Sequence, residues 1–510
     1  MKLNSFVPSA DLPAALVVFL VALPLCLGIA LGSGAPLLSG IVAGVVGGVV
    51  VGLLSHSPLS VSGPAAGLTT VVLAAVSELG AFDLFLVAVV LSGAMQVVLG
   101  LLRLGVVGHY VPNTVIKGMM AAIGLILILK QLPHLVGYDA DYFGDEGFAQ
   151  PDHENTFSAV VHALGSLSPG AALVGFLSLA LLQLAENFGY AKTAVGKALP
   201  TALLAVAGGT LLAQLLPSLL GPEWSVAAIH RVQLPELGSS WSAPQWNGLT
   251  NPLVWSTALA LALIASLESL LSIEAADRID PLKRVTPTNR ELMAQGAGNI
   301  ASGLLGGLPI TSVVVRTSVN AQAGAQSRWS AVFHGIILAL SVVLLTQVLN
   351  LIPLASLAAI LIATGFKLTH PTKVIRPIAT QGYMQWIPFA VTVVAILLTD
   401  LLKGIAVGLL VSTVFIAFND FKSNVSLTHI GSNYILQLRR NVSFLNKGKL
   451  KQSLEKLPNG TELLVDFTQA DFVDPDILDV VHDFASHSEL KRIRVTLRRS
   501  PHQNYLPDLN

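Results

Sequence analysis

Two ionisable residues stand out because each lies within a hydrophobic stretch of the chain. Glu268 lies in the stretch 251–275, and Arg316 lies in the shorter stretch 311–323. An ionisable side chain inside a bilayer costs on the order of 3 kcal/mol, so such residues usually face a protein interior or a water-filled path and take part in function. We therefore expect Glu268 and Arg316 to bind a substrate or a coupling ion.

Arg316 has the chemistry of an anion site. Its guanidinium group stays charged and presents a planar fork of N–H donors that matches an oxyanion. It could bind the anion directly, or it could neutralise Glu268 across the site. The alternative is a structural arginine whose long side chain reaches the cytoplasmic interface.

Glu268 could couple transport to a cation in two ways. Ser272 lies four residues further on and therefore on the same face of a helix, so carboxylate and hydroxyl oxygens could together hold Na⁺. Thr69 is a third candidate ligand for this ion. The carboxyl could instead take up and release a proton. The alternative is a structural carboxylate that accepts hydrogen bonds from a helix N-terminus. Na⁺ as a coupling ion is the only cofactor that we expect.

Two hydrophobic segments are broken at matching places in the two halves of the chain. The first, Ser62–Thr70, begins with Ser-Gly-Pro, and the second, Thr311–Asn320, follows Gly-Leu-Pro-Ile. Unwound backbone survives in a membrane only where protein or a polar cavity covers it, and paired broken segments mark the binding sites of transporters. Two facing helix N-termini would direct N–H groups and positive dipole ends at an anion.

The breaks thus predict where an anion binds. The alternative is a pair of ordinary kinked helices whose glycines permit close packing. The predicted substrate-binding residues are Ala65, Ala66, Thr69, Thr311, Ser312, Val313 and Arg316.

Composition indicates an integral membrane protein. Hydrophobic residues make up 53% of the 510 residues and charged residues only 11%, whereas a soluble chain carries about 25% charged residues. Lys+Arg and Asp+Glu both total 29, which gives no reason to expect a nucleic-acid partner. Cys26 is the single cysteine, so an internal disulfide is excluded. Neither a catalytic triad nor a phosphate-binding loop is present, and we do not expect an enzyme.

Hydrophobic stretches of about 20 residues predict membrane-crossing helices. We count about fourteen spans in two sets of seven, 12–216 and 251–420, and because seven is odd the two sets must be inverted in the membrane. The predicted spans are 12–31, 35–54, 63–77, 82–102, 111–132, 159–184, 197–216, 251–275, 291–307, 311–323, 330–350, 353–368, 383–400 and 403–420. Of these, 63–77 and 311–323 are too short to cross as full helices.

Loop charges predict the orientation. Lys and Arg concentrate in loops on the side of the N-terminus, with examples at Arg103, Lys192 and Arg328, which predicts that both termini are cytoplasmic. The opposite loop, 133–158, is acidic and includes Asp139, Asp145, Glu146 and Asp152, which we take as solvated charges. The first span continues into further spans, so we expect it to be retained rather than cleaved as a signal peptide. We expect a multi-pass protein of a bacterial inner (plasma) membrane.

The tail 422–510 is polar and predicts a second, small α/β domain. Strands are expected at Tyr434–Leu438, Glu462–Phe467 and Arg492–Leu497, and helices at Leu450–Leu457 and Ile477–Ser486. We therefore predict a transmembrane domain over 1–421 and a reduced cytoplasmic domain over 422–510.

The chain resembles the SulP family of anion transporters, also called solute carrier family 26. The resemblance rests on Val21–Pro24, Ser60–Pro64, Glu291–Asn299 and Arg316–Asn320, and it covers nearly the whole chain. It implies fourteen spans in inverted seven-plus-seven repeats with gate and core subdomains. It also implies a cytoplasmic STAS domain (sulfate transporter and anti-sigma-factor antagonist) and, commonly, homodimers.

The resemblance also implies a substrate class. Family members carry sulfate, bicarbonate, chloride, dicarboxylates and related anions. The pair Glu268 and Ser272 is similar to an acidic-plus-hydroxyl pair that binds Na⁺ in cyanobacterial bicarbonate transporters, where the acid is Asp. In the tail, Asp474 is followed by Pro475 instead of the family's usual Ser, which puts regulation by phosphorylation at that position in doubt.

Together these observations predict a secondary active transporter that imports a small inorganic oxyanion by symport with Na⁺ or H⁺ and an elevator-type movement. Bicarbonate is favoured over sulfate. The alternatives are an anion exchanger or an uncoupled anion channel of the same fold, a sulfate or dicarboxylate symporter with H⁺, a nucleobase permease of similar architecture, and a membrane sensor whose tail binds a cytoplasmic partner.

Overall fold

The computed structural model describes residues 7–498 apart from 142, 144–146, 149–153, 191–192, 194, 197–198, 235–240, 381, 424, 432 and 444–445. The predicted loop charges Lys192, Asp145, Glu146 and Asp152 lie outside the described residues. The chain forms two compact units, Met1–Leu409 and Leu410–Asn510. The predicted boundary at 421 lies within helix α19 (Leu401–Ser423), which crosses this division.

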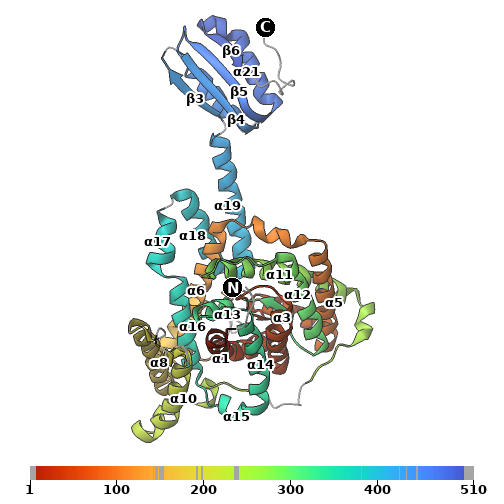
Figure 1. Cartoon of the computed structure of the whole chain (residues 1–510), viewed down its shortest axis with the longest axis vertical. Coiled ribbons are helices and arrows are strands. Elements are labelled where there is room, and N and C mark those ends of the chain that lie inside the picture. Colours follow the sequence, from red (N-terminus) through yellow and green to blue (C-terminus); the bar gives the residue numbers. More distant parts are fainter. Residues whose placement is uncertain are drawn as a thin grey trace. The chain divides into compact units, whose positions relative to one another are not determined.

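The first unit is an assembly of hydrophobic helices (Figure 1). Helices or broken segments occupy each predicted span, and seven of the described helices are long and apolar enough to cross a membrane. In the first half the elements are α1 (Pro8–Gly32), α2 (Leu37–Val46), η1 (Gly47–Val51), α3 (Gly52–Leu54), β1 (Ser62–Pro64), η2 (Ala66–Leu68), α4 (Thr69–Leu79), α5 (Phe82–Leu101), η3 (Leu104–Tyr110), α6 (Asn113–Leu135), α7 (Thr156–Gly165), α8 (Pro169–Asn187) and α10 (Thr201–Leu220).

The second half repeats this plan after a connection that includes three short turns. The turns are η5 (Pro222–Trp224), η6 (Ala228–His230) and η7 (Trp246–Thr250). The elements that follow are α11 (Pro252–Ile279), α12 (Thr288–Leu304), β2 (Ile310–Ser312), α13 (Val314–Gln322), α14 (Trp329–Leu344), α15 (Thr346–Leu349), α16 (Leu354–Leu368), η8 (Pro371–Ile375), α17 (Arg376–Ala379), α18 (Tyr383–Leu398) and α19.

Two predicted spans are wrong as single helices. The stretch 159–184 divides into α7 and α8, because Ser168 is extended (φ −90°, ψ 109°) before Pro169, as a residue that precedes proline prefers. The stretch 330–350 divides at Leu345 (φ −122°, ψ 14°), where α14 ends and the single turn α15 begins.

The two broken segments meet in a short antiparallel β-pair. β1 pairs with β2 so that Ser62 is opposite Ser312, Gly63 opposite Thr311 and Pro64 opposite Ile310. The Val313 N–H also donates to the Val61 carbonyl at 3.1 Å. These bonds satisfy backbone groups that a break in a membrane helix would otherwise leave unpaired.

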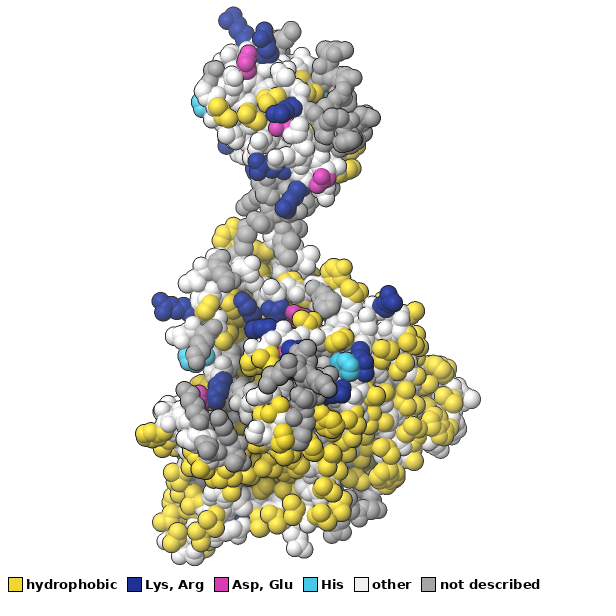
Figure 2. Space-filling model, in the orientation of Figure 1, with side chains coloured by type: hydrophobic (Ala, Val, Ile, Leu, Met, Phe, Trp, Pro, Cys, Tyr) yellow, Lys and Arg dark blue, Asp and Glu magenta, His cyan; other side chains and the backbone are white. Residues whose placement is uncertain are grey.

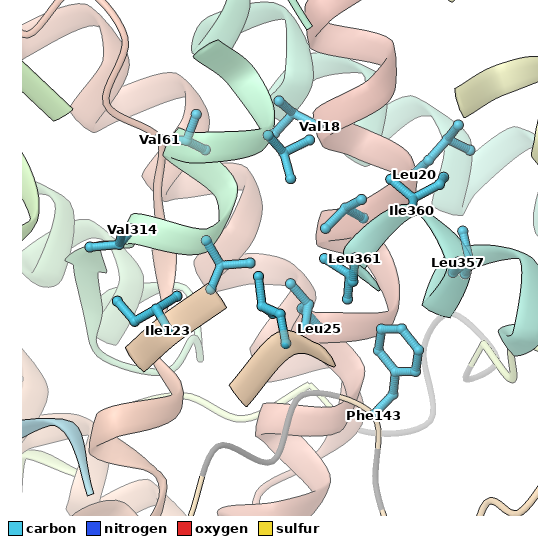
Figure 3. Packing of buried hydrophobic residues seen from close by; sticks show 14 of the residues in the cluster. Val18, Leu20, Leu25, Val61, Ile123, Phe143, Val314, Leu357, Ile360 and Leu361 are labelled. Atoms are coloured by element: carbon cyan, nitrogen blue, oxygen red, sulfur yellow. The ribbon is translucent and has the colours of Figure 1, made fainter. Parts of the chain in front are cut away.

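Hydrophobic side chains fill the interior of this unit and also cover its outside. Figure 3 shows a buried cluster in which Val18 and Leu25 of α1, Ile123 of α6 and Leu361 of α16 pack together. Val314, at the start of α13, belongs to the same cluster, so the second broken segment is anchored in the packed interior. On the face in Figure 2, hydrophobic side chains form a broad surface below a zone of Lys and Arg, as lipid contact requires.

Asp139 departs from its prediction as a solvated charge. Its side chain is buried, where it hydrogen-bonds to Nδ1 of His134 at the end of α6 and, at 2.6 Å, to Nδ1 of His230 on η6. Burial opposes ionisation of this carboxyl, but the two histidines outweigh burial and hold the pKa of Asp139 below its usual value of 3.8.

The second unit is a four-stranded sheet with two helices. Its elements are β3 (Val425–Ile430), β4 (Asn433–Val442), α20 (Lys447–Glu455), β5 (Glu462–Val473), α21 (Pro475–His487), η10 (Ser488–Lys491) and β6 (Arg494–Arg498). The strand order is β3-β4-β5-β6, with β4, β5 and β6 parallel and β3 antiparallel at the edge. The predicted strand–helix–strand–helix–strand order is confirmed, and the structure adds β3. Figure 1 shows α21 beside this sheet.

Candidate functional site

The candidate site is built where the two breaks turn into helices. β1 leads through η2 into α4, and β2 leads directly into α13. The first N–H groups of a helix have no partner within the helix. Because β1 and β2 are antiparallel neighbours, both helix starts lie close to the β-pair, and their N–H groups and dipoles favour a negative charge there.

Arg316 is the charged group of this region. It lies in the first turn of α13, and its side chain is 0% exposed. Nη2 donates to the Pro64 carbonyl at 3.4 Å, whereas Nε and Nη1 have no hydrogen-bond partner among the described residues. The guanidinium lies against Gly63, where any Cβ atom would overlap Nη1. Burying a charged group with unused donors is costly unless a partner of opposite charge arrives.

The predicted hydroxyl groups divide into two kinds. The Oγ1 atoms of Thr69 and Thr311 are buried and have no hydrogen-bond partner in the described part of the chain. Ser312 is already engaged, because its hydroxyl lies 2.5 Å from that of Ser60 and its N–H donates to Ser269 Oγ at 3.2 Å. Thr69 and Thr311 therefore have free hydrogen-bonding capacity for a ligand.

The remaining predicted substrate residues contribute backbone and shape. Ala65 is buried, and Ala66 and Val313 are partly buried. Ala65 and Val313 have extended backbone and immediately precede η2 and α13.

Glu268 lies at the opposite end of the first break from Arg316. The glutamate is only 5% exposed, and a Cβ atom added to Gly67 would lie 3.1 Å from its Oε1 atom. Arg316 touches Gly63, so the run Gly63–Gly67 has a cation at one end and a carboxyl group at the other. Ser272 is also buried, one turn along α11 from Glu268. The structure thus brings Arg316 and Glu268 to the two ends of one break, and Ser272 lies one helical turn from Glu268.

No cluster of three or more His, Cys, Asp or Glu side chains suited to a metal occurs among the residues that the structure describes. The predicted Na⁺ site at Glu268, Ser272 and Thr69 has a different composition, a single carboxyl group with two hydroxyls. Oxygen donors of this kind fit a hard cation such as Na⁺, and the site stays a prediction.

Sequence reasoning missed the residues that hold the breaks in place. Asn299 of α12 donates from Nδ2 to the Ile310 carbonyl at 2.9 Å and accepts the Ile310 N–H at Oδ1 at 2.6 Å. The same Nδ2 donates to Gln96 of α5 at 2.7 Å. From α13, Thr317 accepts the Val61 N–H at 3.1 Å.

A signal for these residues was present in the sequence. Glu291, Gln295 and Asn299 recur every four residues and therefore share one helix face in a stretch rich in Gly and Ala. A polar stripe along a membrane helix predicts buried hydrogen bonds, and the structure buries all three side chains completely.

Two further residues adjoin Arg316. The thiol of Cys26 on α1 and the imidazole of His334 on α14 are fully buried, and both interact electrostatically with the guanidinium. The electrostatic environment of Arg316 therefore includes α1 and α14 as well as the first break.

A cavity of about 610 Å³ lies beside α13 on the side of the unit where α1 begins. Its lining includes Pro13 and Val17 of α1, Val319 of α13, and Ile360 and Thr364 of α16. Val319 follows Arg316 by three residues, so both project from nearby positions on α13. The cavity thus borders the C-terminal half of α13, which also contributes Gln322, on the side predicted to be cytoplasmic.

Comparison with known proteins agrees with this architecture. Residues 9–415 match the model of the sulfate permease family. The protein YvdB of Bacillus subtilis is 30% identical over 406 residues, which cover 79% of this chain and 73% of YvdB. The bicarbonate transporter BicA of Picosynechococcus sp. is 26% identical over 416 residues, which cover 79% of this chain and 69% of BicA.

Among solved structures, the murine Solute Carrier 26 family member A9 anion transporter in the inward-facing state is similar, with a TM-score of 0.66 and 16% identity over 96% of this chain and 85% of that chain. This likeness shows the fold. The relatives are named as transporters rather than as enzymes. The match over residues 9–415 shows that the chain belongs to the sulfate permease family of anion transporters.

Proposed function

We propose that this protein is a secondary active transporter that carries a small inorganic oxyanion through the site between the two breaks. The observation that supports this most is Arg316, a fully buried arginine beside two helix starts, with two donor atoms that have no hydrogen-bond partner in the part of the chain that the structure describes. An oxyanion would accept hydrogen bonds from Nε and Nη1 and from the Thr69 and Thr311 hydroxyls. It would also supply the negative charge that the buried guanidinium lacks.

The balance of charge favours bicarbonate over sulfate. Arg316 provides one positive charge, and Glu268 provides either none or one negative charge. A monoanion is neutralised by one arginine, whereas a dianion would leave excess negative charge in a region of low dielectric constant. The names of the relatives do not decide between the two anions, because BicA is named a bicarbonate transporter and YvdB a putative sulfate transporter.

Glu268 is the proposed coupling group. A proton or Na⁺ bound at its carboxylate would cancel its repulsion of the anion, so cation and anion would bind more tightly together than separately. Ser272 and Thr69 distinguish the two cations, because Na⁺ needs several oxygen ligands and a proton needs only the carboxylate.

Alternating access would follow from movement of the elements that build the site. We propose that the breaks, together with α11, move as one body against α6, α8, α10 and α16. The cavity beside Val319 and Thr364 lies between these two groups of helices and would be the route on the cytoplasmic side.

The orientation and assembly of the protein complete the proposal. We propose that both termini are cytoplasmic, that the membrane is a bacterial inner membrane and that the protein forms homodimers. Cysteine labelling from one side of intact cells tests the orientation, and crosslinking in the membrane tests the dimer.

Uptake into reconstituted liposomes tests the function. Liposomes with the purified protein are given radiolabelled bicarbonate or sulfate, with an inward Na⁺ gradient, an inward H⁺ gradient or neither. We expect bicarbonate uptake that one gradient accelerates. Uptake that neither gradient changes would contradict symport, and equal or faster sulfate uptake would contradict the preference for bicarbonate.

A further inference from the structure

A second buried carboxyl group lies on α12, away from Glu268. Glu291 is 0% exposed, although it lies only one turn from the beginning of the helix. Its Oε2 atom is hydrogen-bonded to the Ser55 hydroxyl, and its Oε1 atom accepts from Gln295 Nε2 at 2.8 Å. Both partners are neutral, so neither compensates a full negative charge.

The charged groups around Glu291 do not neutralise it. Asp277 on α11 adds a second negative charge nearby. Arg290 donates to the Leu54 carbonyl at 3.0 Å, and Arg328 donates to the Ser55 carbonyl at 3.2 Å and contacts His56 at 3.3 Å. Among the described residues, no ion pair joins a Lys or Arg to Glu291. Since an unpaired buried carboxylate is costly, the neutral, protonated form becomes accessible, opposed by the positive dipole end of α12.

Gln295 links this carboxyl group to the first break. Its Nε2 atom donates one hydrogen to Glu291 and the other to Ser62 Oγ at 2.7 Å. Its Oε1 atom is buried and has no hydrogen-bond partner within the described part of the chain. Ser62 is in β1, directly opposite Ser312 of β2. A single amide group therefore contacts both the carboxyl group and the β-pair of the candidate site.

Two hydrogen-bonding arrangements follow from this geometry. With Glu291 ionised, the amide N–H groups donate to the carboxylate and to Ser62, and the Ser62 O–H is free to donate elsewhere. With Glu291 protonated, a half-turn of the amide places Oε1 where it accepts from the carboxyl O–H and from the Ser62 O–H. Each arrangement makes two hydrogen bonds, and the amide atom left without a partner is Oε1 in the first and Nε2 in the second.

We propose that Glu291 is a proton-binding site and that Gln295 transmits its protonation to Ser62 at the first break. The proton joins a carboxylate oxygen of Glu291 and comes from water. Its arrival reverses the direction of both hydrogen bonds of Gln295 and turns the Ser62 O–H toward the amide. The proton state of Glu291 thereby changes which donors face the anion site.

A chain of polar groups leads toward Glu291 from the turn after α11. The Thr286 hydroxyl lies 2.6 Å from Asp277 Oδ1 and 3.1 Å from the Ser57 hydroxyl. The Ser57 N–H donates to Ser55 Oγ at 3.0 Å, and Ser55 contacts the carboxyl group of Glu291. These groups give the carboxyl group polar neighbours on the side away from Gln295.

Infrared spectroscopy of the purified full-length protein tests the proton site directly. We expect the pH-difference spectrum to contain the C=O band of a protonated carboxyl group that Glu291→Gln removes. Glu78→Gln, which changes an exposed glutamate on α4, and Glu268→Gln should both keep this band. A spectrum that Glu291→Gln leaves unchanged would overturn the proposal.

Gln295→Met tests the hydrogen-bonded link between Glu291 and Ser62. It also provides a second test of the proton site if the Glu291→Gln protein does not fold. Methionine has a similar length but no amide, so we expect the Glu291 band to shift toward that of a carboxyl group without an acceptor. An unshifted band would show that Gln295 does not contact the protonated carboxyl group. That result would contradict the proposed reversal of the Gln295 hydrogen bonds.

The consequence for transport rests on the proposed function, but the proton site does not. We expect the pH dependence of anion uptake to change in Glu291→Gln and in Gln295→Met, and to stay as in the wild type in Glu78→Gln. If the wild-type protein takes up neither anion while the infrared band behaves as expected, the proposed substrate is wrong and the proton site stands. If uptake is present and its pH dependence is the same in all variants, the proposed effect of Glu291 protonation on the anion site is wrong. The proposed transport function is then still supported.

Discussion

Ser62 and Ser312 lie directly opposite each other in the antiparallel pair of β1 and β2. One belongs to the first half of the chain and the other to the second, 250 residues later. Their pairing brings two broken helices together at a single place. Because β1 and β2 run in opposite directions, α4 and α13 start from this place with opposite orientations, as inverted halves require.

The glycines of the first break should be intolerant of any side chain. A Cβ atom at Gly63 would overlap the Arg316 guanidinium, and one at Gly67 would crowd the Glu268 carboxyl at 3.1 Å. Overpacking usually costs about 1–3 kcal/mol, so we expect Gly63→Ala to lower anion uptake roughly tenfold or more, and Gly67→Ala to lower it less. Gly208→Ala is the matched control, because a Cβ atom there meets open space. Equal uptake by all three variants would contradict the packing.

Removing the charge of Glu268 should uncouple transport from the cation gradient. We expect Glu268→Gln to keep residual anion uptake that no longer responds to Na⁺ or H⁺ gradients, because the amide is permanently neutral and cannot gain or lose a proton. Ser272→Ala should weaken the response only if Na⁺ is the coupling ion. Gradient-driven uptake that persists fully in Glu268→Gln would remove this residue from the coupling role.

Loss of Asn299 should lower stability rather than affect anion binding directly. Asn299→Leu leaves both the N–H and the C=O group of Ile310 without their side-chain partner. Each unsatisfied buried group costs about 1–3 kcal/mol, so we expect a lower melting temperature in detergent. Asn289→Leu, near the start of the same helix, removes a single acceptor, that of the Gly105 N–H at 2.9 Å, and should therefore have the smaller effect. If Asn299→Leu melts at the wild-type temperature, the hydrogen bonds between Asn299 and Ile310 do not stabilise the fold.

The Asp139 carboxyl group should make stability depend on acid pH. Its pKa is lower in the folded protein than the usual value of 3.8, because hydrogen bonds from His134 and His230 outweigh the effect of burial. This contribution to stability is complete above the unfolded pKa and is lost as the pH falls through the folded pKa, below 3.8. We expect the melting temperature of the wild type to fall more steeply than that of Asp139→Asn in this acid range. If the melting temperatures of the two proteins change in parallel with pH, the Asp139 carboxylate does not contribute to the acid dependence of stability.

The sequence was sufficient to predict the architecture because lipid leaves few choices. Long hydrophobic stretches, matched breaks and a polar tail predicted the membrane unit and the small α/β unit. The division of 159–184 at Ser168 escaped prediction, although Pro169 was a visible signal. Leu345 has no comparable signal, since its backbone geometry depends on packing.

The candidate site was predictable in composition but not in its internal contacts. Burial of Arg316 and Glu268 followed from the cost of charge in a membrane. That they contact Gly63 and Gly67 of the same segment could not be predicted, because the register of β1 and β2 joins residues far apart in the chain. The links from Asn299 to Ile310 and from Gln295 to Ser62 depend on the same tertiary packing.

Uptake by variants of Arg316 tests the central claim most directly. Losing charge-assisted hydrogen bonds costs about 1.5–3 kcal/mol each, so we expect Arg316→Gln to lower the initial rate of bicarbonate uptake into liposomes at least about tenfold. Arg316→Lys should restore part of the rate, because it keeps the charge without the planar fork. Arg103→Gln, at an exposed position, is the matched control and should transport like the wild type. Wild-type uptake by a correctly folded Arg316→Gln protein would contradict an anion site between the two breaks.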